Sequence, residues 1–94
     1  MTKADLVRIV SDDTGIVRKD VSLAVDAFLE AVRDTLKEGK HIEIRGFGTY
    51  KLKTRKARIG RNPKTEEKVT VPERIVPTFK FSRGFKQEVN DANK

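Results

Sequence analysis

The chain has 94 residues, 36% of them hydrophobic, and a formal net charge of +7, which predicts one small domain spanning residues 1–94. Residues 1–40 contain seven Lys and Arg against eight Asp and Glu, whereas residues 41–94 contain fourteen against six, so a polyanionic partner is favoured, either nucleic acid or an anionic membrane surface. The absence of cysteine excludes disulfides and thiolate metal sites, and the single histidine, His41, has no partner for metal binding or general-base catalysis. We therefore expect no enzymatic activity, no metal and no cofactor.

The first predicted helix begins near the start of the chain. Thr2 followed by Asp5 is typical of a helix cap with an acidic residue in the first turn. Apolar residues then recur at helical spacing until Gly15, which suits the end of a helix. This start lacks the apolar core of a signal peptide, and no apolar run is long enough to span a bilayer. We expect a cytoplasmic protein.

The second predicted helix carries a stronger apolar stripe. It begins between residues 17 and 20 and ends near Glu38 and Gly39. The stripe consists of Val21, Val25, Phe28, Leu29, Val32 and Leu36. Its spacing places all six on one face of a helix.

From Gly39 onward the apolar period changes from helical to two. Ile42 and Ile44 precede the turn at residues 46–48, and Tyr50 and Leu52 continue the apolar face after it. This pattern predicts a β-hairpin within an antiparallel sheet over residues 40–81.

Residues 53–76 are predicted to project from that sheet as a two-stranded arm. The first part of the arm is strongly basic and has no face that a core could bury. Its cations are Lys53, Arg55, Lys56, Arg58, Arg61, Lys64 and Lys68. Pro72 and Pro77 remove backbone donors, so the returning strand is expected to lie at an edge or to be kinked. Ser82 can then cap a short final helix over residues 82–90, with Phe85 and Val89 facing inward.

A body of roughly 70 residues is marginal for a single hydrophobic core. The apolar helix stripe and the apolar sheet face together exceed what one chain can cover, which favours a two-fold dimer. We assign its core to Phe28, Leu29, Val32, Leu36, Ile44, Phe47, Tyr50 and Phe79. The alternative for the aromatic residues is ordinary packing within one chain.

A dimer would carry two basic arms that could embrace a DNA duplex. Their cations would contact phosphates, giving salt-dependent affinity with little sequence preference. Pro63, in the segment Gly60–Lys68, has two interpretations: a wedge inserted between base steps of the minor groove, or a residue that starts a turn. The arm has no apolar face to insert into lipid, which disfavours a membrane-surface role.

Three segments resemble the bacterial HU and integration host factor family: Arg45–Tyr50, Gly60–Thr65 and Val76–Lys80. The resemblance implies an α+β fold in which two chains intertwine, with a helical part (1–39), a β-sheet saddle with one long arm per chain, and a short C-terminal helix. It implies an architectural protein of the nucleoid that bends duplex DNA. Because inserting a wedge costs unstacking energy, we expect bent, nicked or gapped duplexes to bind more tightly than a linear duplex.

The same resemblance assigns the DNA-binding residues. Pro63 corresponds to the family's intercalating residue at the tip of the arm, and Arg61 and Asn62 to the groove contacts beside it. It also assigns contacts to Arg55, Arg58 and Arg74 on the arm and to Lys3, Lys80 and Lys86 on the body. Lys53, Lys56 and Lys64 are added as further cations of the basic arm. Glu66 stands where the family commonly has glycine, so the tip turn is expected to differ.

Arg45 resembles the residue with which the beta subunit of integration host factor helps to recognise a preferred site. A sequence-preferring DNA bender is therefore one alternative, and a ribosomal-type RNA-binding protein is a second, from another class. The partner is expected to be an identical chain, with a related chain as the alternative.

Overall fold

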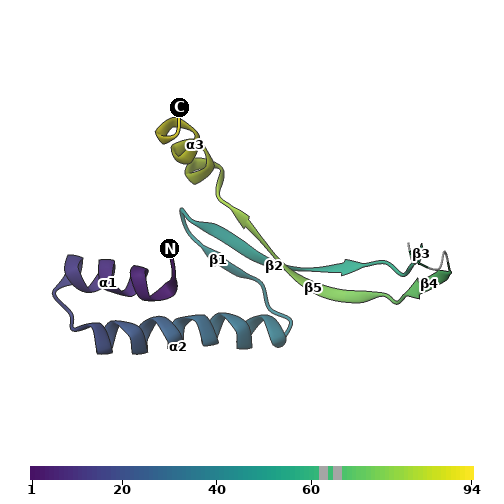
Figure 1. Cartoon of the computed structure of the whole chain (residues 1–94), viewed down its shortest axis with the longest axis horizontal. Helices are drawn as coiled ribbons and strands as arrows, with labels where there is room; N and C mark the ends of the chain where they lie inside the picture. Colours follow the sequence, from purple (N-terminus) through teal and green to yellow (C-terminus); the bar gives the residue numbers. More distant parts are fainter. Residues whose placement is uncertain (62–63, 65–66) are drawn as a thin grey trace.

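A computed structural model describes residues 1–61, 64 and 67–94. Two helices come first, a sheet with a projecting arm follows, and a third helix ends the chain (Figure 1). The elements are α1 (Lys3–Thr14), α2 (Arg18–Lys37), β1 (Ile42–Ile44), β2 (Gly48–Arg55), β3 (Arg58–Arg61), β4 (Lys68–Val71), β5 (Arg74–Phe81) and α3 (Arg83–Ala92). This order confirms the predicted α+β class.

Helices α1 and α2 lie side by side, and α2 runs below the start of the sheet (Figure 1). The predicted cap of α1 is confirmed as a capping box, in which Thr2 accepts from the backbone N–H of Asp5 and Asp5 accepts from that of Thr2. Helix α2 follows Val17, which provides no side-chain cap. Val21 and Val32 of its stripe are buried in the chain, and this packing helps to stabilise α2.

The sheet that rises above α2 has the strand order β1-β2-β5, and all its pairs are antiparallel. Strands β3 and β4 form a second, two-stranded sheet that continues outward from it (Figure 1). Pro72 lies between β4 and β5, and Pro77 lies within β5 at an edge of the three-stranded sheet. Both positions confirm the expected effect of proline.

An aromatic cluster joins the sheet to α3. Phe79 lies 4.6 Å from Tyr50 and 4.7 Å from Phe81 between ring centroids, and Phe47 lies within 5.9 Å of Phe79, Phe81 and Phe85. Ser82 caps α3 as predicted, because its hydroxyl accepts from the backbone N–H of Phe85 at 3.2 Å. The cluster thus forms within one chain.

Much apolar surface nevertheless stays open in the single chain. In the part of the chain that the structure describes, the buried apolar side chains are Val7, Val21 and Val32. Phe28 is 55% exposed and Phe47 is 41% exposed, and Leu29 is also exposed. Of the other residues assigned to a dimer core, Leu36, Ile44, Tyr50 and Phe79 are half-buried.

Candidate nucleic-acid interface

The three-stranded sheet has two chemically different faces. Directly opposed pairs on β2 and β5 alternate between them, because successive side chains of a strand point to opposite sides. Tyr50 with Phe79 and Leu52 with Pro77 point toward α2, where the groove between helix and sheet is also lined by Leu36. The other face carries five cations, which we call the basic face: Lys51, Lys53, Arg55, Arg74 and Lys80.

The cations of the basic face are exposed, and none forms an ion pair with any residue that the structure describes. Some cations of the helical part do form ion pairs: Lys37 pairs with Asp34, and Lys40 pairs with Glu38 just beyond α2. Glu43 on β1 is the acidic residue that shares this side of the sheet, opposite Thr49. A surface with this excess of positive charge attracts a polyanion.

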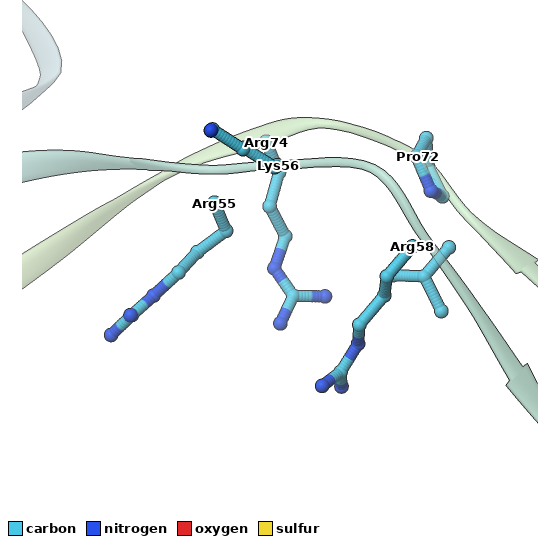
Figure 2. A pocket seen from close by; sticks show the side chains of 6 residues that line it. Arg55, Lys56, Arg58, Pro72 and Arg74 are labelled. Atoms are coloured by element: carbon cyan, nitrogen blue, oxygen red, sulfur yellow. The ribbon is translucent and has the colours of Figure 1, made fainter.

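Arg55 and Arg74 are direct cross-strand partners at the base of the arm. Together with Arg58 they line a pocket in which Figure 2 shows all three guanidinium groups directed to the same side. Lys56 also lines this pocket, but its side chain points to the other side (Figure 2). The structure thus brings together three of the predicted arm contacts and separates the fourth from them.

Two of the remaining predicted arm contacts, Arg61 and Lys64, lie in the described part of the outer arm. Arg61 is opposite Lys68 in the β3–β4 register, and Lys64 is exposed in the turn beyond them. Asn62 and Pro63, the predicted groove contact and wedge, lie outside the described residues. Ile59 is 71% exposed although it is apolar. An exposed apolar side chain on a basic arm suits contact with the sugar and base edges of a groove.

Arg45 is exposed in the β1–β2 turn, where Gly46 has a φ of 78°. Ser82 fixes this turn to the start of α3: its N–H donates to the carbonyl of Phe47 at 2.8 Å, and its hydroxyl donates to that of Gly46 at 3.2 Å. Sequence reasoning identified Ser82 as a cap but missed this second role. The two segments are 36 positions apart, so no local pattern indicates the contact.

The three predicted body contacts do not share one site. Lys80 belongs to the basic face, and Lys86 lies on α3 beside Phe81 and Phe85. Lys3 on α1 forms an ion pair with Asp26 of α2 at 2.6 Å. In the free chain Lys3 therefore has a carboxylate partner, unlike the cations of the basic face.

Lys51 was missed by the sequence-based assignment although it belongs to the basic face. The signal was present, since Lys51 and Lys53 are two residues apart on a strand and must point to the same side. In the register of β2 and β5, Lys53 lies opposite Val76 and Lys51 lies opposite Thr78, so both lysines are on the basic face.

Other chemistry finds no support in the residues described. Among residues 1–61, 64 and 67–94, no three His, Cys, Asp or Glu side chains gather in a group that could hold a metal ion. No helix of that part combines the length and the apolarity that a membrane span needs.

Comparisons with known proteins show the family to which the chain is related. A family model described as bacterial DNA-binding protein matches residues 1–90. Integration host factor subunit beta of Marinobacter nauticus is 45% identical over 95 residues, covering 100% of this chain and 97% of that protein. DNA-binding protein HU of Clostridium pasteurianum is 39% identical over 90 residues, covering 96% of this chain and 99% of that protein.

A solved structure shows the same arrangement of elements. The HU chain of the Anabaena HU–DNA cocrystal structure superposes with a TM-score of 0.89 at 35% identity. The match covers 95% of this chain and 97% of that chain.

Proposed function

The chain belongs to the bacterial DNA-binding protein family that includes HU and integration host factor, and we propose that two copies of it clasp duplex DNA between their arms. Members of this family are non-enzymatic, architectural proteins that bind and bend DNA.

The observation that carries the proposal is the basic face with its continuation into the arm. Five exposed cations lie on one side of the sheet, and Arg58 extends the row past the end of β2. Two-stranded ribbons are narrow enough to follow a DNA groove. Such contacts go mainly to phosphates, which are present at every step of any sequence.

We assign the arms to the minor groove and Pro63 to the role of wedge. Apolar side chains inserted from the minor groove partly unstack a base step and kink the duplex. Exposed Ile59 and Val69 on the outer arm supply further apolar surface for the sugars that line this groove. The proposed location is the cytoplasm, on the nucleoid, where duplex DNA is the dominant polyanion.

The open apolar surface supports the pairing of two chains. Phe28 and Leu29 on α2 and Phe47 and Phe81 around the sheet remain exposed in one chain. We propose an identical chain as the partner. A related chain is the alternative, because the integration host factor relatives are named as beta subunits.

Gel-shift titration of the purified chain on intact and nicked duplexes, at two salt concentrations, tests the proposal. Nicked duplex should bind more tightly, because part of the cost of deformation has already been met. Affinity for both duplexes should fall steeply with salt. Equal affinity for the two duplexes would argue against bending, and affinity independent of salt would argue against the phosphate contacts.

Pro63→Ala tests the wedge separately. It should keep most of the affinity, since the cations remain, but it should reduce the bend angle measured by energy transfer between labels at the duplex ends. Lys56→Ala is the control. It removes a cation from the other side of the arm but leaves the tip intact, so the bend angle should stay the same. An unchanged bend angle in Pro63→Ala would falsify the wedge.

Arg45 favours sequence preference as a second candidate function, because the β1–β2 turn holds it exposed and Ser82 fixes that turn. Competition between a candidate site and random duplex tests it. A specific binder prefers its site by on the order of 10³-fold or more. A ratio near unity assigns the chain to the binders without sequence preference.

A further inference from the structure

Ser82 belongs to two parts of the molecule at once. It is the N-cap of α3, where its hydroxyl accepts from the backbone N–H of Phe85 at 3.2 Å. The same hydroxyl donates to the carbonyl of Gly46 at 3.2 Å, and the backbone N–H of Ser82 donates to the carbonyl of Phe47 at 2.8 Å. A hydroxyl has one donor and two acceptor positions, so it can form both of its bonds together. One residue thus joins the start of α3 to the β1–β2 turn.

The turn that Ser82 holds carries Arg45. The backbone N–H of Phe47 donates to the carbonyl of Ile44 at 3.0 Å, which closes a four-residue turn with Arg45 and Gly46 at its centre. Gly46 has a φ of 78°, which glycine adopts at the third position of such a turn without steric cost. The carbonyls of Gly46 and Phe47 are not used by this bond, and both accept from Ser82. The backbone directly after Arg45 is therefore fixed by the start of α3 as well as by the turn's own bond.

Ring contacts support the same junction. Phe47 lies 5.6 Å from Phe81 and 5.9 Å from Phe85 between ring centroids, so aromatic residues before and after Ser82 both contact the turn. The structure describes the whole of α3, and none of its residues is buried. Figure 1 shows α3 at the end of the sheet where β1 turns into β2. The positions of α3 and of the turn therefore depend on each other through this junction.

Reading a base demands more of an arginine than binding a phosphate does. An arginine recognises guanine through two hydrogen bonds in a fixed geometry, whereas phosphates are present at every step of the duplex and carry no sequence information. A side chain that reads a base has to be held within about 0.5 Å of its working position by its surroundings. Arg45 is exposed and forms no ion pair with a described residue. The chain thus fixes Arg45 through its backbone, and Ser82 provides part of that support.

We propose that Ser82 is a positioning residue for Arg45, and that its hydroxyl bond to Gly46 determines how strongly the chain prefers one DNA sequence over another. The inference rests on the second candidate function, sequence preference through Arg45. Ser82 acts through the turn and needs no contact with DNA of its own. Loss of the hydroxyl bond lets Arg45 move relative to α3, which weakens a directional contact with a base and leaves the phosphate contacts of the basic face in place.

Selection from a library of duplexes with a randomised segment provides the probe. The preference is the ratio of two dissociation constants, that of the starting library divided by that of the sequence which the unmodified chain enriches. Arg45→Ala should lower this ratio by about tenfold, which is the scale of one two-bonded base contact. Ser82→Gly should lower it by about threefold or more, the scale of one neutral hydrogen bond. Its affinity for the starting library should change by less than about twofold, because the phosphate contacts remain.

Glycine is chosen at position 82 because it keeps the N–H that bonds to Phe47 and is itself a tolerated N-cap. Circular dichroism checks that the helices persist. Ser82→Thr keeps a hydroxyl and should hold the ratio within about twofold of that of the unmodified chain. Thr2→Gly is the matched control, because it removes the cap hydroxyl of α1, which bonds to Asp5 on a different helix. It should leave the ratio unchanged.

A double variant separates positioning from general damage to the fold. If Ser82 acts through Arg45, Ser82→Gly combined with Arg45→Ala should have the same ratio as Arg45→Ala alone, whereas independent effects would multiply. An unchanged ratio in Ser82→Gly, a loss that also occurs in Ser82→Thr, or multiplied effects in the double variant would overturn the proposal.

The same selection distinguishes this failure from that of the proposed function. If the unmodified chain binds and bends the library duplexes but enriches no sequence, sequence preference and the role of Ser82 are both wrong, and the architectural function stands. If Arg45→Ala loses the preference and Ser82→Gly keeps it, the role of Ser82 alone is wrong. If the chain binds no duplex, the proposed function is wrong as well.

Discussion

At the scale of single residues, Gly48 of β2 lies so close to Phe79 and Lys80 of β5 that no side chain fits there. A Cβ atom at Gly48 would lie 2.7 Å from the carbonyl oxygen of Lys80 and 2.8 Å from Cε2 of Phe79. We predict that Gly48→Ala lowers the free energy of unfolding by about 1–3 kcal/mol, the usual cost of overpacking. Urea denaturation at one fixed protein concentration measures it.

Gly84→Ala is the matched control for Gly48→Ala. Gly84 lies in α3, where a Cβ atom would meet nothing within 4 Å. This substitution should leave stability unchanged or raise it by about 0.4–1 kcal/mol, since alanine restricts the unfolded chain. A similar loss in both variants would show that the close approach to Phe79 is not the cause.

Asp5 gives the fold a pH dependence at acidic pH. Hydrogen bonds donated by the backbone N–H and the hydroxyl of Thr2 hold the pKa of this carboxyl below its ordinary value of 3.8. A lowered folded-state pKa means that the ionised carboxylate stabilises the fold above that value, and that this stabilisation is lost as the pH falls through the folded-state pKa. We predict that Asp5→Asn is less stable than the unmodified chain near pH 7, and that the difference shrinks below pH 3.8.

Asp12→Asn provides the comparison for Asp5→Asn. It removes the same charge from the last turns of α1, where a carboxylate opposes the helix dipole. Its stability in urea near pH 7 should equal or exceed that of the unmodified chain. If it falls as far as that of Asp5→Asn, net charge rather than the capping box determines the effect.

Some of these residue roles could be predicted from sequence and others could not. The spacing of Thr2 and Asp5 indicated the cap because a capping box is local. The second role of Ser82 and the crowding at Gly48 depend on contacts between distant segments, Ser82 with Gly46 and Gly48 with Phe79. Such contacts have no signature in either segment alone.

At the scale of elements, successive side chains of β2 and β5 alternate between the apolar face and the basic face, and this alternation creates the interface. The period of two predicted which residues share the apolar face, and it could equally have predicted the basic face, including Lys51. The change in side-chain direction between β2 and β3 could not be predicted. Pro72 indicates that strand pairing is interrupted there, but it does not indicate how the outer strands are turned relative to the sheet. For this reason the sequence assigned Arg55, Arg58 and Lys56 alike, whereas the structure separates Lys56 from the two arginines.

The basic face makes a quantitative prediction for salt dependence. Each phosphate neutralised contributes about 0.9 to the slope of log affinity against log salt concentration. Lys53→Ala should therefore lower the magnitude of that slope by up to about 0.9 per chain, with similar effects on unrelated duplex sequences. Lys37→Ala is the control, because Lys37 lies on α2 on the apolar side of the sheet. An equal change of slope in both variants would indicate bulk charge instead of a contact.

At the scale of the whole molecule, the chain is far more extended than its length requires. Its radius of gyration is 19.0 Å, whereas a compact chain of this length has about 12 Å. The arm explains part of the difference, and the open arrangement of helices and sheet explains the rest (Figure 1). The sequence predicted the order of elements because each has a local period, but it could only indicate that apolar surface was left over.

That apolar surface leads to a prediction about assembly. We expect the chain, whose monomer mass is 10.7 kDa, to sediment at twice that mass at micromolar concentration. Phe28→Asp places a charge on the exposed part of the α2 stripe and should raise the dimer dissociation constant by more than about tenfold, since desolvating an unpaired carboxylate at an interface is costly.

Leu23→Asp makes the same type of change on the opposite face of α2, five positions earlier, where the side chain is 71% exposed. It should leave the sedimenting mass at the dimer value, because helical spacing directs position 23 away from the stripe that carries Phe28. Circular dichroism of both variants shows whether the helices persist. A monomer for the unmodified chain, or dissociation by Leu23→Asp as complete as that by Phe28→Asp, would mean that the stripe is not where two chains meet.

Two arms on one duplex require this pairing, so the loss of the dimer in Phe28→Asp should also weaken DNA binding, since each arm would then have to bind alone.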